Sequence, residues 1–242
     1  MRTALISDIH GNLEALHAVF DDISTQRVDR VCSLGDVIGY GCDPIACLNL
    51  VVEKCGIKLM GNHEYAAIGV LSSEAMNLNA RQSILWTQSQ LTDREISLIA
   101  GFRMSGVLDD AFLVHASPVE PDEWHYVLSP HDAEEAFRHS SHRLVFHGHT
   151  HLPVIYCQPP VGKIRMIGAH DFDPDEESRY LINVGSVGQP RDNDPRACYA
   201  VYDADEESVS FRRVEYDIET TQAKMCRADM PQMLIDRLQV GR

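Results

Sequence analysis

Apolar residues in the first sixty positions fall into two patterns, short runs and helical spacing. Three short runs are predicted to be strands: residues 3–7, 30–34 and 56–60. Between the first two runs, apolar positions recur at helical spacing from Leu13 to Ile23, and Asn12 is a favourable N-cap for that helix. Pro44 suits the first turn of a second helix over 44–54. This alternation predicts a parallel sheet with right-handed crossovers.

The later part of the chain mixes helices with short strands. Residues 74–101 are predicted to be helical in two pieces, the second beginning at Thr92 with Glu95 completing a capping box. Two short strands are expected on either side of a turn at Asp109–Asp110, and Ser129–Pro130 begins another helix. Further strands are predicted near residues 143–147, 153–157, 163–167, 180–184, 197–203 and 208–214.

Two remaining segments complete the organisation. Residues 169–178 are acidic and irregular, which is typical of a surface loop, and one or two short helices are expected from about residue 217. No linker separates two units, so residues 1–242 are predicted to form a single domain with an α/β fold and a mixed or antiparallel second half.

Side chains able to bind a metal follow several of the predicted strands. They occur in the segments Asp8-x-His10, Gly35-Asp36, Gly61-Asn62-His63-Glu64, His115 and "HGHTH" at 147–151. Loops at the carboxyl ends of parallel strands form the ligand crevice of α/β sheets, so these side chains are expected to meet there. Asp8 and His10 are expected to face the same side because residues two apart do so in an extended chain, and Gly11 permits a tight exit.

The types and number of these residues point to two metal ions. Seven residues are candidate ligands: Asp8, His10, Asp36, Asn62, His115, His149 and His151. Imidazole, carboxylate and amide groups together suit Mn, Fe, Co, Ni or Zn better than calcium, which prefers oxygen alone. Seven candidates exceed the needs of one tetrahedral ion, whereas two ions sharing a bridging carboxylate would use them all.

Composition and charge exclude several classes of protein. The 242 residues are 44% hydrophobic and 24% charged, and no run approaches the roughly 18 apolar residues of a membrane helix. The net charge of −15 disfavours stable binding to nucleic acid. Seven cysteines, with no C-x-x-C pair, are expected to be reduced and mostly buried, which favours a cytoplasmic location.

The order D-x-H, GD, GNH(E/D), H and GHTH over residues 8–151 resembles that of the calcineurin-like metallophosphoesterase superfamily. A further segment, "NVGSVGQPRD" at 183–192, resembles the N-x-GS-x-x-x-PR segment of its small bacterial and archaeal phosphodiesterase branch. The resemblance implies a four-layer α-β-β-α sandwich, in which helices flank two mixed β-sheets.

The resemblance also implies an activity and a role for each residue. Asp8, His10 and His151 would hold one ion, Asn62, His115 and His149 the other, and Asp36 would bridge them. The ions would be divalent transition metals, with Mn expected first and Fe, Zn, Ni or Co as alternatives. A hydroxide bridging the ions would hydrolyse phosphodiester or phosphomonoester bonds, and His63 would act as the general acid.

Substrate and class alternatives remain open. A small phosphorylated substrate is expected; phosphodiesters come first, and phosphomonoesters, phosphoproteins and dinucleoside polyphosphates are alternatives. A DNA nuclease is disfavoured by the net charge of −15. A non-catalytic protein-binding scaffold of this fold is also disfavoured, because His63 and the seven candidate ligands are all present. Neither a membrane association nor a particular oligomeric state is indicated.

Several residues near these motifs have two interpretations each. Arg191 could clamp a substrate phosphate or form a surface ion pair with Asp192 or Asp194, and Asn12 could contact substrate or only cap its helix. Glu64 could orient His63 or begin the next helix. His147 fits no ligand position and is expected to pack beside the site. The aromatic residues Trp86, Trp124 and Tyr126 could be core or a substrate wall. His17 lies near the apolar face of the first helix and is expected to have a packing role, and the remaining histidines are expected at the surface: His125, His131, His139, His142 and His170.

Overall fold

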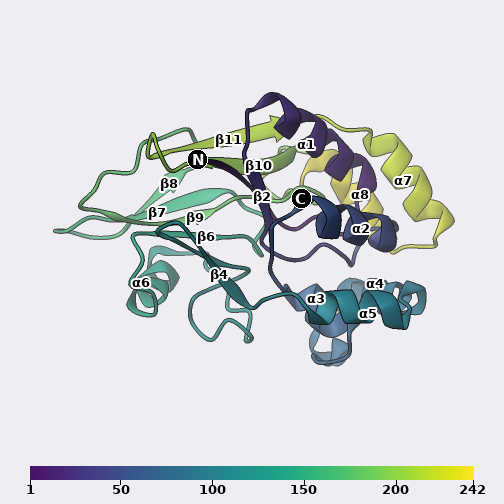
Figure 1. Cartoon of the computed structure of the whole chain (residues 1–242). Coiled ribbons are helices and arrows are strands. Elements are labelled where there is room, and N and C mark those ends of the chain that lie inside the picture. Colours follow the sequence, from purple (N-terminus) through teal and green to yellow (C-terminus); the bar gives the residue numbers. More distant parts are fainter.

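Two β-sheets packed face to face, with helices on their outer faces, make up the computed structural model, which describes residues 1–242 except the side chain of Ala75 (Figure 1). The five-stranded sheet has the order β11 (Ser208–Val214), β10 (Ala197–Asp203), β1 (Arg2–Ile6), β2 (Arg30–Ser33) and β3 (Ile57–Lys58). The six-stranded sheet has the order β4 (Ser105–Leu108), β5 (Ala111–Val114), β6 (Leu144–His147), β9 (Arg179–Asn183), β7 (Val154–Gln158) and β8 (Arg165–Gly168). The predicted four-layer sandwich is confirmed.

Both sheets are mixed. In the first sheet β1, β2 and β3 run parallel, as the β-α-β-α-β order predicted, and β10 and β11 add antiparallel strands. In the second sheet β5, β6 and β9 run parallel, whereas β4, β7 and β8 are antiparallel to their neighbours. Each sheet therefore has a set of parallel strands whose carboxyl ends share one edge.

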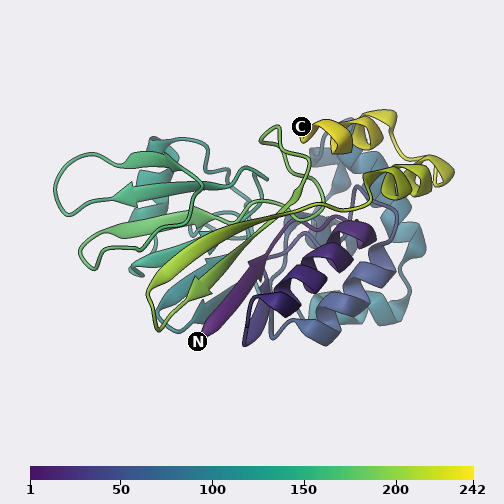
Figure 2. The same cartoon turned by 90° about the horizontal axis from the view of Figure 1, so that it is seen from above.

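The helices cover both outer faces and one end of the sandwich. Their bounds are α1 Leu13–Thr25, α2 Pro44–Lys54, α3 Asn62–Ala67, the 3₁₀ turn η1 Ser73–Ala75, α4 Leu78–Gln90, α5 Asp93–Ala100, α6 Pro130–Arg138, α7 Ile218–Arg227 and α8 Gln232–Val240. Helices α1 and α2 run side by side along the first sheet (Figure 2), and α6 packs on β7 and β9 of the second. Helices α3, α4 and α5 gather beyond the strands (Figure 1).

The alternation of side chains along the central strands explains why both faces of each sheet are covered. In β1, Ala4 and Ile6 pack against the apolar side chains of α1 and α2, while Leu5 points into the layer between the two sheets. In β6, Phe146 joins the same middle layer and Val145 packs against α6. Because both faces are buried, such strands are continuous apolar runs in the sequence.

Most predicted elements are confirmed, with two corrections at the third strand. β3 covers only Ile57–Lys58 instead of 56–60, because the backbone N–H of Met60 donates to Arg103 and no longer to β2. The short helix α3, which begins at Asn62, was not predicted because it is only 6 residues long. Within the described residues, no helix has both the length and the apolar character needed to cross a membrane.

Candidate metal centre

The candidate ligands come from loops of both sheets. Asp8 and His10 follow β1, and Asp36 follows β2. His115 follows β5 of the second sheet. Asn62 begins α3, and His149 and His151 follow β6. All except the half-buried Asn62 are buried. The edges at which the parallel strands of the two sheets end therefore meet at one place.

One group consists of Asp8, His10 and His151, whose ligand atoms all lie within 4.8 Å of one another. The Nδ1 atoms of the two imidazoles face backbone carbonyls, those of Ile38 at 3.2 Å and Gln189 at 2.6 Å. Each Nδ1 therefore carries the proton, and each Nε2 keeps its lone pair. The two Nε2 atoms are only 3.0 Å apart. Two facing lone pairs repel, and a cation between them removes the repulsion.

A second group surrounds Asp36 and contains His115 and His149, also with all ligand atoms within 4.8 Å. His115 Nδ1 lies 2.9 Å from the carbonyl of Leu34, so its Nε2 faces Asp36 Oδ2 at 3.4 Å. Nε2 of His115, Nε2 of His149 and Oδ1 of Asn62 are buried without a hydrogen-bond partner. Buried polar atoms are rarely left unpaired. The two imidazole atoms beside Asp36 fit the ligand set of a metal ion, and Asn62, which lines the same cavity as His149, could add an amide oxygen.

Asp36 lies between the two groups. Its Oδ2 is 3.7 Å from His10 Nε2 and 3.4 Å from His115 Nε2, while its Oδ1 accepts the backbone N–H of His63 at 3.0 Å. Burial raises the pKa of Asp36, but His115 and His63 outweigh it and hold that pKa well below its ordinary value. An ionised carboxylate in this position could be shared by two cations.

Most of the histidines at the site have a lowered pKa, so their imidazoles are neutral near pH 7 and able to bind a metal. Burial lowers the pKa of His149 to about 3 and that of His63 to about 4, and it holds the pKa of His10 and His151 well below the ordinary value. At His115 burial also lowers the pKa, but Asp36 and Asp8 outweigh it and raise the pKa to about 9. Both carboxylates thus attract a positive charge to this position.

The backbone at these residues overturns the expectation drawn from strand alternation. β1 ends at Ile6, and both Asp8 (φ 53°) and His10 (φ 51°) have left-handed conformations beyond it. Asp36, His149 and His151 are left-handed as well. A loop with an unusual backbone, and not an extended strand, aims the first two side chains into the site. The tight exit at Gly11 (φ 59°) is confirmed, because an added Cβ would lie 3.1 Å from the Gly41 carbonyl.

Glu64 fixes the loop that carries Asp36. Its buried carboxylate accepts the backbone N–H groups of Asp36 and Val37 at 2.8 Å, Ile38 at 3.1 Å and Gly61 at 2.9 Å. It therefore does not orient the side chain of His63, which was one of the two interpretations. The sequence signal was half of a capping box, since Glu64 stands three residues after the N-cap Gly61 and accepts its backbone N–H.

The segment 183–192 fixes the other ligand loops. Asn183 donates to the carbonyl of Gly148 at 2.6 Å and to Thr150 Oγ1 at 3.0 Å, inside the segment "HGHTH". Ser186 Oγ donates to the carbonyl of Asp8 at 2.8 Å. His147 is buried next to Asn183, which agrees with the packing role expected of it. The motif "NVGSVGQPR" thus ties both sheets together at the site.

His63 lies beside both groups and borders an open cavity of about 550 Å³. Its Nδ1 is buried without a partner, and its ring lies 4.4 Å from that of Tyr40. Tyr126 stacks on His149 at 4.2 Å, and both Tyr126 and Trp124 line the cavity. These two aromatic residues therefore form a wall of the cavity. Trp86 packs with Ala80, Met225 and Leu234 in a separate apolar core.

The two predicted substrate contacts differ in their surroundings. The Asn12 amide is used within the protein: Oδ1 accepts the N–H of Ala15 at 3.1 Å as a helix cap, and Nδ2 donates to Gly188 at 2.9 Å. Arg191 donates to Gln189 Oε1 at 2.8 Å and lies over the Tyr40 ring at 5.7 Å. Among the ion pairs of the described residues, none joins Arg191 to Asp192 or Asp194, which pair with Arg213 and Arg196.

The fold consists of two facing mixed sheets, and imidazoles, carboxylates and an amide gather where their parallel strands end. This fold and this candidate metal centre are those of a metallophosphoesterase. The model of the calcineurin-like phosphoesterase superfamily domain matches residues 1–207, and the chain belongs to this superfamily. Membership supports a hydrolase that acts on phosphoester bonds.

Similar proteins come from bacteria and archaea. The structure of a metallophosphoesterase from Sphaerobacter thermophilus is 38% identical, with a TM-score of 0.87 and all of both chains covered. The uncharacterized protein MJ0912 of Methanocaldococcus jannaschii is 33% identical over 99% of this chain and 98% of its own length. The hypothetical protein PH1004 from Pyrococcus horikoshii OT3 shares the fold at 17% identity, with a TM-score of 0.80 over 100% of this chain and 98% of its own.

Proposed function

We propose that this protein is a binuclear metal-dependent phosphodiesterase that also accepts some phosphomonoesters. One observation carries the proposal: His115 and His149, whose ligand atoms cluster with that of Asp36, both have a buried Nε2 without a hydrogen-bond partner, and Oδ1 of Asn62, which lines the same cavity as His149, is also unpaired. Packing alone does not account for these atoms, because each is a buried polar atom that has lost water and gained no hydrogen bond in exchange. Metal coordination accounts for all three together.

The ligand sets follow the two groups of side chains. Asp8, His10 and His151 would hold one divalent ion, the three residues around Asp36 would hold the other, and Asp36 would contact both. Bound divalent ions neutralise phosphate charge and lower the pKa of coordinated water towards about 7. We propose Mn²⁺ as the first metal to test, because a mixed nitrogen and oxygen set accepts it alongside Fe, Zn, Ni and Co.

His63 and Arg191 would act on the substrate directly. We assign His63 as the general acid because its ring borders the cavity. Its pKa of about 4 in the protein alone would rise beside a phosphate anion, because a nearby negative charge favours the imidazolium. The backbone N–H of His63 donates to Asp36 and holds the start of α3 at the site. Arg191 would bind phosphate oxygens of the substrate through its planar fork. Asn12 is not included among the proposed substrate contacts, because its amide is already used twice within the protein.

The substrate is proposed to be a small phosphodiester. The resemblance of "NVGSVGQPR" to the phosphodiesterase branch supports this choice, and the aromatic wall formed by Trp124 and Tyr126 would contact an organic group of the ester. Asp122 and Glu123 also line the cavity, and the net charge is −15. Both features weigh against long polyanions such as DNA. The unpaired cysteines support a reducing, cytoplasmic location.

The test is hydrolysis of bis-p-nitrophenyl phosphate and p-nitrophenyl phosphate by metal-stripped protein, with and without added Mn²⁺. Turnover that requires the metal, stops with chelator and favours the diester is expected. Activity that persists in chelator would contradict the proposed centre. An inactive protein that still binds two equivalents of Mn²⁺ would favour the scaffold alternative.

Replacement of His63 separates catalysis from metal binding. His63→Ala is expected to lower kcat by roughly 10²–10⁴ while both metal equivalents remain bound, because His63 is not a proposed ligand. His17→Ala is the matched control, since His17 is exposed on α1. Metal content is measured by elemental analysis, and unchanged turnover in His63→Ala would remove His63 from the mechanism.

A further inference from the structure

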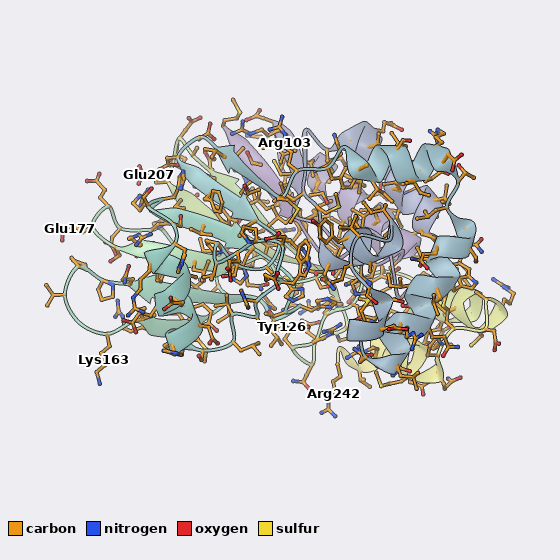
Figure 3. The ribbon with its side chains drawn as sticks, turned by 90° about the horizontal axis from the view of Figure 1, so that it is seen from below. Arg103, Tyr126, Lys163, Glu177, Glu207 and Arg242 are labelled. Atoms are coloured by element: carbon orange, nitrogen blue, oxygen red, sulfur yellow. The ribbon has the colours of Figure 1, made fainter. Side chains whose placement is uncertain are left out.

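A second cavity, with two arginines and no carboxylate among its described lining residues, adjoins the one at the metal centre. Its volume is about 370 Å³, and Tyr40, Asn77 and Tyr126 line both cavities. Arg191 lines it from the segment after β9, and Arg237 lines it from α8. Figure 3 shows Tyr126 where the strand-rich half of the molecule meets the helical half, and Arg242 beside the C-terminal helices.

The two arginines share a single neutral partner. Nη2 of Arg191 and Nη1 of Arg237 both donate to Oε1 of the buried Gln189, at 2.8 Å and 3.0 Å. The remaining side-chain contact of Arg237 is from Nε to the main-chain oxygen of Arg242, at the end of the sequence. Two guanidinium groups held this closely repel each other, and an amide oxygen does not neutralise them.

The nearby acidic side chains pair with other arginines. Asp192 pairs with Arg213, and Asp194 pairs with Arg196 and lies 3.8 Å from Arg213. Arg191 Nε is buried without a partner. In a chain with a net charge of −15, a pair of arginines that has no acidic side chain as partner among the described residues is a local concentration of positive charge. Burial, and then the charge of Arg191, lower the pKa of Arg237 to about 10.

The position of the pair relates it to the candidate metal centre. The backbone N–H of Arg191 donates to the carbonyl of His151, a candidate ligand, at 3.2 Å. Gln189, which both arginines contact, accepts from His151 Nδ1 through its backbone carbonyl. One short segment therefore supports a ligand of the first metal group and holds the arginine pair beside it.

We propose that Arg191 and Arg237 form a second anion site for a phosphoryl group adjacent to the one at the metal centre, so that the substrate contains a diphosphate unit. The planar fork of arginine matches phosphate oxygens, and two forks on one cavity suit a multiply charged group. This inference rests on the proposed function for the position of the first phosphoryl group. It gives the C-terminal helix α8 a role in substrate selection.

The experiment compares two non-hydrolysed probes by calorimetry. Orthophosphate and imidodiphosphate are titrated into Mn²⁺-loaded protein, with free Mn²⁺ held equal in all titrations. The natural chain is expected to bind imidodiphosphate at least tenfold more tightly than orthophosphate. Arg237→Gln is expected to reduce this ratio to less than about threefold. Arg138→Gln, which removes the same charge from the exposed face of α6, is the matched control and should keep the ratio.

A second variant keeps the test independent of any effect of Arg237 on folding. Gln189→Glu changes little in shape but places a carboxylate between the two arginines, and it is expected to abolish the preference for imidodiphosphate. The proposal would be overturned if the wild-type protein bound imidodiphosphate and orthophosphate equally well. It would also be overturned if both Arg237→Gln and Gln189→Glu left the ratio of the two affinities within twofold of the wild-type value. If the affinity ratio depends on Arg237 but the protein hydrolyses no phosphoester, the anion site is supported and the proposed function is refuted.

Discussion

Five candidate ligands have a left-handed backbone, which few residues other than glycine adopt: Asp8, His10, Asp36, His149 and His151. Such conformations cost roughly 1–3 kcal/mol each and persist only where the surrounding structure imposes them. Here single side chains impose them. Glu64 binds the loop after β2, Asn183 binds the loop after β6, and Ser186 binds the loop after β1.

Glu64→Gln is expected to weaken metal binding by roughly 10–100-fold, as the loss of groups that orient ligands does. Two backbone N–H groups point at each carboxylate oxygen, so a side-chain NH₂ at either position would face donors instead of an acceptor. Mn²⁺ affinity is measured by calorimetry, with Glu53→Gln on the exposed side of α2 as control. An affinity within twofold of wild type would show that Glu64 does not support the site.

Gly39→Ala is expected to lower kcat by at least tenfold while the metals stay bound. Gly39 has φ +83°, and an added Cβ would lie 2.1 Å from His63 Nδ1, so His63 must move. Gly69→Ala is the control because Gly69 has a similar φ of +79° but nothing within 4 Å of the added Cβ. The backbone penalty of roughly 1–2 kcal/mol for a residue with a Cβ in the left-handed region is therefore common to both variants. Equal kcat values in the two variants would contradict the proximity argument.

At the scale of elements, helices are joined to the sheets by apolar packing and by a few polar contacts, one of them near the end of α1. Asp22, near the end of α1, accepts the Tyr199 hydroxyl of β10 at 2.6 Å and pairs with Arg212 of β11 at 3.1 Å. Burial alone would raise the pKa of Asp22, but the hydrogen bonds from Arg212 and Tyr199 outweigh it and lower that pKa below its ordinary value of 3.8.

Asp22→Asn is expected to lower the free energy of unfolding at pH 7 by about 1 kcal/mol, since Arg212 is partly exposed and its ion pair is screened. A lowered folded-state pKa contributes stability above pH 3.8, and this contribution disappears as the pH falls through the folded-state pKa. The difference between variant and wild type, followed by urea unfolding from pH 7 towards pH 3, should therefore shrink at the acid end. Asp21→Asn, exposed in the same helix, should show little difference at any pH.

At the scale of the whole molecule, the candidate site lies in the seam where the two sheets meet. Asp36 follows β2 of the first sheet and His115 follows β5 of the second. Their atoms Oδ2 and Nε2 lie 3.4 Å apart, so this contact joins loops of the two sheets. An ion bound by both sheets would bind the native fold and not the unfolded chain, so it should stabilise the whole protein.

Mn²⁺ at about 100 times its dissociation constant is expected to raise the free energy of unfolding by about 2.7 kcal/mol per site. The shift should largely disappear in Asp36→Asn, because Asp36 lies between both groups of ligands. Thermal unfolding with Mn²⁺ or chelator measures it, and Asp173→Asn in the acidic surface loop is the control. A melting temperature that ignores Mn²⁺, or that rises equally in both variants, would refute a specific centre.

Sequence patterns predicted most of the elements because each depends on local spacing. Helix α2 coincides with residues 44–54, where Pro44 sets the start, and α5 follows the capping box of Thr92. The candidate ligands were identified because chemically unusual residues follow apolar runs. The contacts of Glu64 with the loop after β2 and of Asn183 with Gly148 were missed, since these partners lie up to 35 positions away. Only the capping position of Glu64, three residues after Gly61, could be seen locally.

By itself, the sequence determined the α/β class and the residues that could bind metal, because periodicity and residue chemistry are local properties. It also indicated the superfamily through the order of five short motifs. Only the tertiary structure decided that two sheet edges converge on Asp36, that left-handed loops aim Asp8 and His10, and that α8 brings Arg237 to Arg191. Such contacts depend on how layers pack, and packing joins residues whose separation along the chain carries no periodic signal.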